Sequence, residues 1–279
     1  MDRGFLVTLS TMLLLMASLL LVQSSQKAGR NSERAVLDAQ AIDSAAYEFD
    51  DMAWDLNAML GPQINISRNS SESNITFTEQ LPQSDYSSLL SNYSSFIANY
   101  SNWINTNITL NFSGILNGTL LVFSNGLQYD RNATAVRVYA SNAGTNASAY
   151  ELSISSNDYR NIESINNINS MQSGAVKLMV HYSDLNGSIE AIGTFDPNSV
   201  ASYSVSYTGD PASAIMIRVG NFSGSSGSIA VEQTGFLQVG LNLTARGSWN
   251  GSLAYAYNAN MNYSQLNVTK NDLLWVGRH

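Results

Sequence analysis

The sequence predicts an α+β protein in which a long N-terminal transmembrane and amphipathic helix precedes a mainly antiparallel β-sandwich with one packed amphipathic helix. Three observations predict this arrangement. An uncharged apolar run opens the chain, apolar residues then recur at helical spacing, and the period of the pattern later changes to two. We therefore expect a leader at 1–4, a stalk helix at 5–60, a loop and helix at 61–105, and a β-rich domain at 106–279.

The apolar run at residues 5–22 is long enough to cross a membrane. It holds 18 residues without a charge, Pro or Gly, and a helix of that length spans ~27 Å, close to the ~30 Å hydrocarbon core of a bilayer. The alternative is a cleaved secretory signal peptide. However, the run is longer than the usual apolar core of about 7–15 residues, and no clear A-x-A cleavage site follows it. The run therefore predicts a retained membrane-spanning segment.

Helical spacing continues beyond the apolar run. Apolar residues advance in alternating steps of four and three at Ala35, Ala39, Ile42, Ala46, Phe49, Ala53, Leu56 and Leu60. This heptad spacing places them on one face, and Gly61 and Pro62 then end the helix because Pro lacks a backbone donor. Residues 5–60 would form one rod of ~84 Å. Gly29 is the place where a kink would fall.

The four residues before the run, MDRG, carry a resemblance to a known family. A short leader that ends in Arg3 and Gly4 and leads directly into a hydrophobic helix resembles an archaeal type IV pilin or archaellin precursor, over residues 1–60. The resemblance implies that a membrane peptidase cuts between Gly4 and Phe5, and that the apolar helices of many subunits then bundle into a filament core. Leu9 stands where bacterial pilins usually carry Glu, which favours the archaeal class.

An aromatic stripe predicts a second helix at residues 84–105. Tyr86, Leu89, Leu90, Tyr93, Phe96, Ile97, Tyr100, Trp103 and Ile104 follow i, i+3, i+4 spacing, and Ser84 or Asp85 is a plausible cap. The stripe is typical of a face packed on a sheet, although it also suits a glycan-binding ledge. Residues 63–82 before it read as loop with a short strand at 75–78.

Beyond residue 106 the apolar and polar residues alternate, as in an antiparallel sheet with one wet face. Asn-Gly pairs at 117, 125, 186 and 250 mark turns. Residues 157–173 lack the alternation and predict a break between two β halves. The candidate strands are 107–112, 119–123, 127–130, 133–140, 149–155, 175–183, 188–193, 201–207, 214–219, 228–232, 236–245, 252–258 and 262–268.

The N-x-S/T sequon for N-glycosylation is the strongest compositional signal. The chain has 16 sequons, whereas chance placement of its 31 Asn and 55 Ser and Thr residues gives about six, and none precedes Gly61. Two of them, at Asn92 and Asn99, fall on the predicted second helix, where helix geometry would lower their use. The predicted glycosylation sites are Asn65, Asn69, Asn74, Asn107, Asn111, Asn117, Asn132, Asn146, Asn186, Asn221, Asn242, Asn250, Asn262 and Asn267.

The sequons and the basic residues disagree about orientation. Only Arg3 precedes the apolar run, whereas Lys27, Arg30 and Arg34 follow it. The positive-inside rule would therefore place the bulk of the chain in the cytoplasm. Sequons are read only on the outer side of the membrane, so we expect residues 61–279 to be extracellular.

Composition excludes several function classes. The chain has no cysteine, which excludes disulfides, thiolate chemistry and Cys-based zinc sites. Its net charge is −8 and it has no basic patch, so we expect no nucleic-acid partner.

The loops at 184–187, 196–198 and 209–211 contain carboxylates that suit Ca²⁺, but Asp and Asn in turns also cap their own backbone.

No constellation of catalytic residues stands out. The histidines are His181, inside a strand pattern, and His279, the last residue, so a Ser-His-Asp triad would depend on His181 alone. No P-loop, dinucleotide fingerprint, H-E-x-x-H or EF-hand loop is present in the sequence. We expect no cofactor, no metal and no enzymatic activity.

These features predict a structural protein of the cell surface. It would be a pilin-like subunit whose N-terminal helix anchors in membrane lipid or packs against copies of itself in a filament core, with N-linked glycans on the outer domain. Its location would be the cell membrane, as a single-pass protein with an extracellular domain, or an extracellular filament. The alternative is a single-pass membrane-anchored adhesin or glycan-binding protein.

Overall fold

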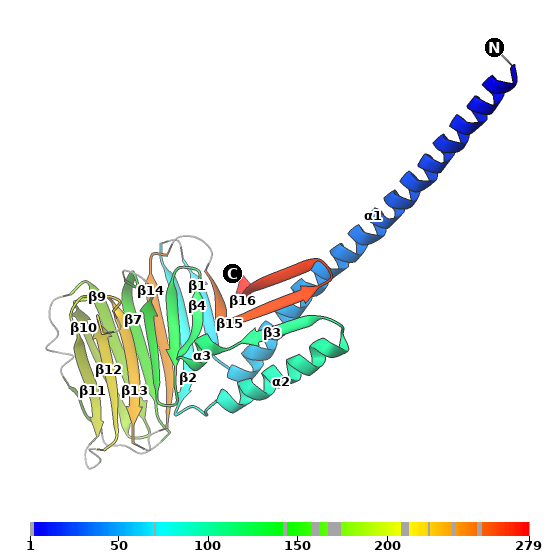
Figure 1. Ribbon diagram of the computed structural model, residues 1–279. Coiled ribbons are helices and arrows are strands. Elements are labelled where there is room, and N and C mark those ends of the chain that lie inside the picture. The colour runs from blue at the N-terminus through cyan, green and yellow to red at the C-terminus, as the bar shows by residue number, and fades with distance from the viewer. Residues whose placement is uncertain are drawn as a thin grey trace.

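A long helix projects from a β-rich head, and the N-terminus lies at the far end of that helix (Figure 1). The computed structural model describes residues 3–69, 71–141, 144–157, 162–166, 174–207, 212–222, 224–235, 238–249 and 253–278. Within these ranges the side chains at 3–10, 162–166, 277 and 278 are outside the description.

The projecting helix is α1 (Arg3–Leu60), with 58 residues. It runs unbroken through Gly29, so the backbone does not stop at the place where a kink was expected. It ends as predicted at Gly61, which adopts φ +61°, a left-handed conformation that suits glycine. The amide of Gly61 donates to the carbonyl of Asn57 (3.0 Å), and Pro62 prevents a further turn.

The prediction of a transmembrane helix is corrected by the structure. Within the part of the chain that is described, no helix is both long enough and apolar enough to cross a membrane. Residues 5–10 of the predicted segment lie outside the described side chains.

The predicted fold class, α+β, is also corrected. The chain is mostly β, with 48% of its residues in strands and 30% in helices, and its sheets form a sandwich-like arrangement. Two short helices accompany α1, namely α2 (Ser87–Trp103) and α3 (Ser113–Leu116). The strands are β1 (Gln63–Arg68), β2 (Ser73–Leu81), β3 (Asn107–Asn111), β4 (Thr119–Phe123), β5 (Leu127–Arg131), β6 (Ala135–Ala140), β7 (Ala147–Ser155), β8 (Ile162–Asn166), β9 (Val176–Asp184), β10 (Gly187–Phe195), β11 (Ala201–Tyr207), β12 (Ala214–Gly220), β13 (Ser228–Thr234), β14 (Val239–Gly247), β15 (Ala254–Gln265) and β16 (Val268–Arg278).

The strands form two sheets. The six-stranded sheet has the order β1-β2-β14-β7-β9-β10. The ten-stranded sheet has the order β16-β15-β4-β5-β6-β13-β12-β11-β8, and β3 pairs with β15 beside this path. All pairings are antiparallel except that of β7 with β9, which run parallel in the register Leu152 to Val180. A parallel pair needs a crossover connection rather than a tight turn.

Two segments contain more strand than was predicted. The stretch at 63–82, where a strand was expected only at 75–78, holds the hairpin of β1 and β2, in which Ile64 pairs with Phe77. The expected break at 157–173 contains β8, which pairs with β11 at the edge of the ten-stranded sheet. Residues 158–161 and 167–173 of that break lie outside the described chain.

The inner faces of the two sheets pack together and form the core. Phe77 of β2 stacks on Tyr129 of β5, with ring centroids 4.3 Å apart and planes inclined by 5°. Phe77 also meets Phe123 of β4 edge to face, with centroids 5.7 Å apart. Strands β2, β7 and β14 alternate between buried and more exposed residues, which is the pattern of sheets with one buried face.

The aromatic stripe of α2 divides between core and surface. Leu90, Tyr93 and Ile97 are buried as expected for a packed face. Phe96 and Trp103 of the same stripe are exposed, Trp103 by 90%. The helix begins later than predicted, and its N-cap is Tyr86, which makes no side-chain capping hydrogen bond, instead of the predicted Ser84 or Asp85. Asp85 accepts a hydrogen bond from the amide of Ser87 (2.9 Å), as in an Asx turn that precedes the helix.

Candidate assembly surface

The N-terminal half of α1 exposes apolar side chains on every side. Five consecutive residues from Met12 to Met16 are exposed, and consecutive residues of a helix point in directions ~100° apart, so they encircle the axis. The most exposed of them is Leu14 at 74%, and Leu21 further along reaches 72%. The exposed apolar residues of this segment are Met12, Leu13, Leu14, Leu15, Met16, Leu19, Leu20, Leu21 and Val22. They form a contiguous apolar cylinder that no part of the described head covers.

The C-terminal half of α1 belongs to the core of the head. Met52 and Leu56 are at most 1% exposed, and the helix lies against β15 and β16 (Figure 1). The predicted heptad seam is therefore split. Its later members Phe49, Ala53, Leu56 and Leu60 are buried, whereas its earlier members Ala35, Ala39, Ile42 and Ala46 remain exposed. The exposed part of the seam lies further along the same helix, separated from the apolar cylinder by the mostly polar residues at 23–34.

Charge is segregated along the exposed part of α1. Lys27, Arg30 and Arg34 lie just beyond the apolar cylinder, with Glu33 among them. Further along, Asp43, Asp50 and Asp51 lie exposed on the part of the helix that borders the head. The helix thus presents a basic segment at 27–34 and an acidic segment at 43–51.

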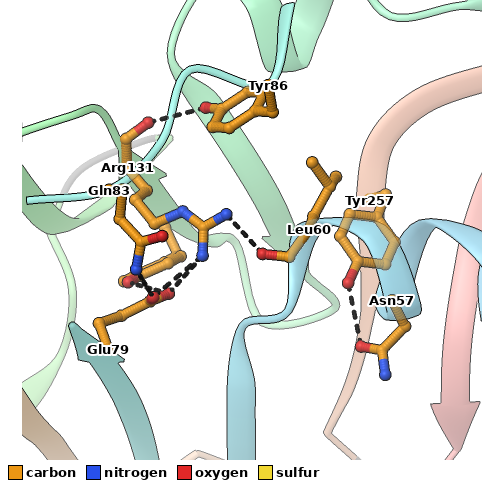
Figure 2. Close-up of polar contacts among 8 residues, drawn as sticks. Asn57, Leu60, Glu79, Gln83, Tyr86, Arg131 and Tyr257 are labelled. Carbon is orange, nitrogen blue, oxygen red and sulfur yellow. Dashed lines mark hydrogen bonds and ion pairs between the residues drawn. The ribbon is translucent and has the colours of Figure 1, made fainter. Parts of the chain in front are cut away.

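A buried polar cluster fixes the end of α1 to the head (Figure 2). Arg131 of β5 donates to both carboxylate oxygens of Glu79 of β2, at 3.0 and 2.9 Å. The same guanidinium group donates to the carbonyl of Leu60 (2.5 Å), the last residue of α1. The side chains of Arg131 and Glu79 are only 3% and 2% exposed. Because buried charges need partners, this cluster holds the sandwich and the helix end in one arrangement.

Neutral side chains complete this cluster. Tyr129 donates its hydroxyl to Glu79 (2.9 Å), and Gln83 donates its amide to the other carboxylate oxygen (2.9 Å). Tyr86 donates to the carbonyl of Arg131 (2.9 Å), and its ring lies under the guanidinium group at 5.6 Å. Burial raises the pKa of Glu79, and the charge of Arg131 acts against that rise.

Two tyrosines of α2 hold it antiparallel to α1. Tyr93 donates its hydroxyl to Asp55 (2.7 Å), and Tyr100 donates to Glu48 (3.1 Å). The tyrosines are seven residues apart and so are the carboxylates, in the opposite order along the chain. Glu48 is 4% exposed, and one of its oxygens has no hydrogen-bond partner among the described residues. Burial accordingly raises the pKa of Glu48, and the negative charge of Asp51 adds to the rise.

The hairpin of β15 and β16 extends along α1 (Figure 1). The ammonium group of Lys270 lies over the ring of Phe49 at 3.9 Å from its centroid. Nearer the tip of the hairpin, Arg34 donates to the side-chain oxygen of Asn267 (3.3 Å). In addition, Tyr257 of β15 donates to Asn57 (3.0 Å), as Figure 2 shows. Contacts from Arg34 to Leu60 thus fasten the C-terminal half of the helix to the head.

The sequon asparagines lie mostly on the surface of the head. Asn74 of β2 is half-buried, and Asn250 lies outside the described residues. Asn92 and Asn99, the two sequons on α2, are exposed. Of the predicted sites, those with exposed side chains are Asn65, Asn69, Asn107, Asn111, Asn117, Asn132, Asn146, Asn186, Asn221, Asn242, Asn262 and Asn267. The side chain of Asn267 is also engaged by Arg34, as described above.

The predicted processing site lies at the free end of α1. The backbone of Gly4 and Phe5 forms part of the helix. The side chain of Phe5 is not described, and cleavage between Gly4 and Phe5 stays a prediction.

The residues considered for catalysis or metal binding are dispersed. His181 is exposed on β9, and His279 lies outside the described residues. Asp184 accepts backbone hydrogen bonds from Asn186 (2.7 Å) and Gly187 (3.1 Å), and Asp196 accepts one from Asn198 (2.9 Å). These carboxylates therefore cap turns, whereas 209–211 lies outside the described residues. Across the described ranges no group of three or more His, Asp or Glu side chains is placed to hold a metal ion.

Comparisons with known proteins give no match. No family model matches the chain, no curated protein matches it, and no solved structure matches it. Function must therefore be argued from the chain itself.

Proposed function

We propose that this protein is a pilin-like structural subunit of an extracellular filament, and that copies of it assemble through α1. The observation that carries the proposal is the division of α1 into two halves. The C-terminal half is built into the core of the head, whereas the N-terminal half projects from it with apolar residues on all sides. A helix that is hydrophobic all round is a helix that becomes buried.

The α1 helices of other copies of this chain can bury the apolar cylinder. Burial of apolar surface contributes roughly 25 cal/mol per Å², and an exposed contiguous apolar patch marks an interaction site. The exposed alanines Ala35, Ala39 and Ala46 extend this surface toward the head and allow helices to approach closely. The apolar cylinder and these alanines give two contact segments for a bundle of helices, one on each side of the mostly polar residues at 23–34.

The charge pattern favours a parallel and staggered bundle. In register, the basic segment at 27–34 of one helix would meet the same basic segment of its neighbour. A shift of about 16 residues, ~24 Å at ~1.5 Å per residue, instead brings that segment beside the acidic segment at 43–51 of the next copy. Repetition of one shift produces a filament rather than a closed dimer, because such contacts are heterologous.

The head would form the outer surface of this filament. Twelve of the predicted glycosylation sites are exposed on it, and α1 carries no sequon. N-linked glycans at these positions would leave the helical seam free for assembly. This part of the proposal is tested by mass spectrometry of head peptides from native material, with attached glycans expected at several of the exposed sites.

The resemblance to archaeal pilin precursors supplies the processing step of the proposal. We expect the mature chain to begin at Phe5, after cleavage that follows Gly4. Mass spectrometry of the native amino terminus measures this directly, and a native chain that still begins at Met1 would contradict it.

Charge substitutions on the apolar cylinder test the assembly. Leu14→Arg and Leu21→Arg each place a charge on a side chain more than 70% exposed, so the head should fold as before. Leu185→Arg is the matched control, since Leu185 is 54% exposed at the turn between β9 and β10. Electron microscopy and sedimentation would compare the assembly of the three variants with that of the unmodified protein.

The expected outcome separates the variants. Leu14→Arg and Leu21→Arg should lower the polymerised fraction at least tenfold, with an unchanged melting temperature of the head, and Leu185→Arg should polymerise normally. Normal filaments from both helix variants would overturn the proposal.

A further inference from the structure

The outer face of the ten-stranded sheet carries a trough that is lined by both polar and apolar side chains. It has a volume of about 200 Å³ and lies over β6, β11, β12 and β13. Arg137, Arg218, Glu232, Met216 and Phe222 are among the residues that line it. The assembly proposed above makes no use of this face.

The strand register places two arginines on opposite sides of the trough. Ala230 of β13 pairs with Arg137 of β6 on one side and with Arg218 of β12 on the other. Paired residues point to the same face, and strands are ~4.8 Å apart, so the two arginine stems are ~10 Å apart with only a methyl group between them. Both guanidinium groups can therefore reach one anionic group above Ala230.

The next row of the sheet supplies an acceptor. Glu232 of β13 lies between Ala135 and Met216 of the neighbouring strands and is exposed. It projects on the same face as Ala230, two residues along the strand. Its carboxylate can accept hydrogen bonds from hydroxyl groups, whereas it would repel a second negative charge on a ligand.

Phe222 adds an apolar wall beside Arg218. The guanidinium carbon of Arg218 lies 5.9 Å from the centroid of the Phe222 ring. This contact holds the arginine side chain next to the ring. The apolar C–H face of a ligand ring can then lie against Phe222 while its anionic substituent faces the arginines.

We propose that this trough binds a carboxylated sugar, such as a uronic acid residue of a glycan. Two arginines and one glutamate give the site a net charge of about +1, which matches a ligand with one negative charge. Arginine binds a carboxylate through two parallel hydrogen bonds. The glutamate favours a ligand with several hydroxyl groups. A phosphate or sulfate carries more charge and fewer hydroxyl donors, so the same residues disfavour it.

The test is calorimetric titration of the full chain, kept in a non-ionic detergent, with a trisaccharide whose only charged residue is one galacturonic acid and with the neutral galactose trisaccharide. We expect binding of the acidic sugar, and at least tenfold weaker binding of the neutral one. Arg137→Ala and Arg218→Ala should each weaken binding about tenfold, whereas Lys177→Ala, an exposed cation on β9 of the other sheet, should leave it unchanged.

A further variant tests the role of the hydroxyl groups. Glu232→Ala should weaken binding of the uronic acid trisaccharide, and it should not weaken binding of acetate. Equal affinity for the acidic and neutral sugars, or an equal loss in Lys177→Ala, would overturn the proposal. The same holds if acetate binds the unmodified protein as tightly as the trisaccharide does, because the trough would then be a simple anion site.

The sugar has two possible sources, a foreign polysaccharide or a glycan on this chain at Asn221, which precedes Phe222. Titration of native protein and of its Asn221→Gln variant separates them. Binding by both supports a foreign ligand, and binding only by the variant supports occupancy by the chain's own glycan.

Discussion

Arg131 donates a hydrogen bond of 2.5 Å to the main-chain carbonyl of Leu60, the last residue of α1. The last carbonyls of a helix have no partner within the helix, and here a side chain from the sandwich provides one. The same arginine holds Glu79 by two further hydrogen bonds. A single buried cation therefore joins the two sheets to the end of the helix that we propose to drive assembly.

Removal of Arg131 should be strongly destabilising. Arg131→Ala leaves the carboxylate of Glu79 buried without its ionic partner, and loss of one member of a buried pair costs about 3–5 kcal/mol of unfolding free energy. Denaturant unfolding followed by circular dichroism measures this cost. Lys177→Thr, a change of an exposed cation on β9, should stay within about 0.5 kcal/mol of the unmodified protein. An equal effect of the two changes would contradict the role assigned to the cluster.

Truncation of two residues of α1 that are two positions apart should change the unfolding free energy by very different amounts. Leu56 is completely buried, so Leu56→Ala should lower the unfolding free energy by about 3 kcal/mol through lost burial and a cavity. Trp54 is 70% exposed, and Trp54→Ala should change it by less than about 0.5 kcal/mol although it removes a larger side chain. Thermal melting of both variants checks this ordering. A larger loss for Trp54→Ala would mean that the helix packs on the head with another face.

Glu48 should make the head more stable as the pH falls toward mildly acidic values. Its pKa is raised in the folded protein, so the folded state binds this proton more tightly than the unfolded state does. The unfolding free energy must then rise as the pH falls through the raised pKa toward the usual value of 4.5, and this contribution is lost at higher pH.

Comparison with Glu48→Gln isolates this contribution from that of the other carboxylates. As the pH falls from neutral toward 4.5, the unmodified protein should gain stability relative to the variant. Parallel pH profiles of the two proteins would show that Glu48 does not titrate differently in the folded state. Gln40→Ala, a change of an exposed and uncharged side chain of the same helix, serves as the control and should keep the pH profile of the unmodified protein.

The sequence predicted those features that depend on local pattern. Helical spacing located α1 and its end at Gly61, and alternation located most strands from β3 onward, because these patterns depend on backbone period alone. The strand predicted at 75–78 is the middle of β2, whereas β1 was missed because Ile64 and Ile66 are the only apolar residues among its six.

The buried polar cluster of Glu79 and Arg131 has a signal in the sequence. Glu79 follows Ile75 and Phe77 at alternate positions of β2, and Arg131 follows Leu127 and Tyr129 in the same way on β5. A charged residue at an inward position of two strands indicates a buried pair. Which two strands face each other depends on the topology of the sandwich, and no local pattern determines that. The arginines of the trough were missed for the same reason, since Arg137 and Arg218 meet only through strand pairing.

The most direct test of the account is a disulfide cross-link between copies of α1, which the absence of native cysteine makes possible. Arg30→Cys and Ala46→Cys are combined in one chain, with each single variant as a control, because both positions are exposed and are separated by the proposed stagger. Under mild oxidation of assembled protein, parallel staggered helices should give a ladder of covalent multimers from the double variant only. A double variant that stays monomeric, or stops at a closed dimer as antiparallel helices would, contradicts the account.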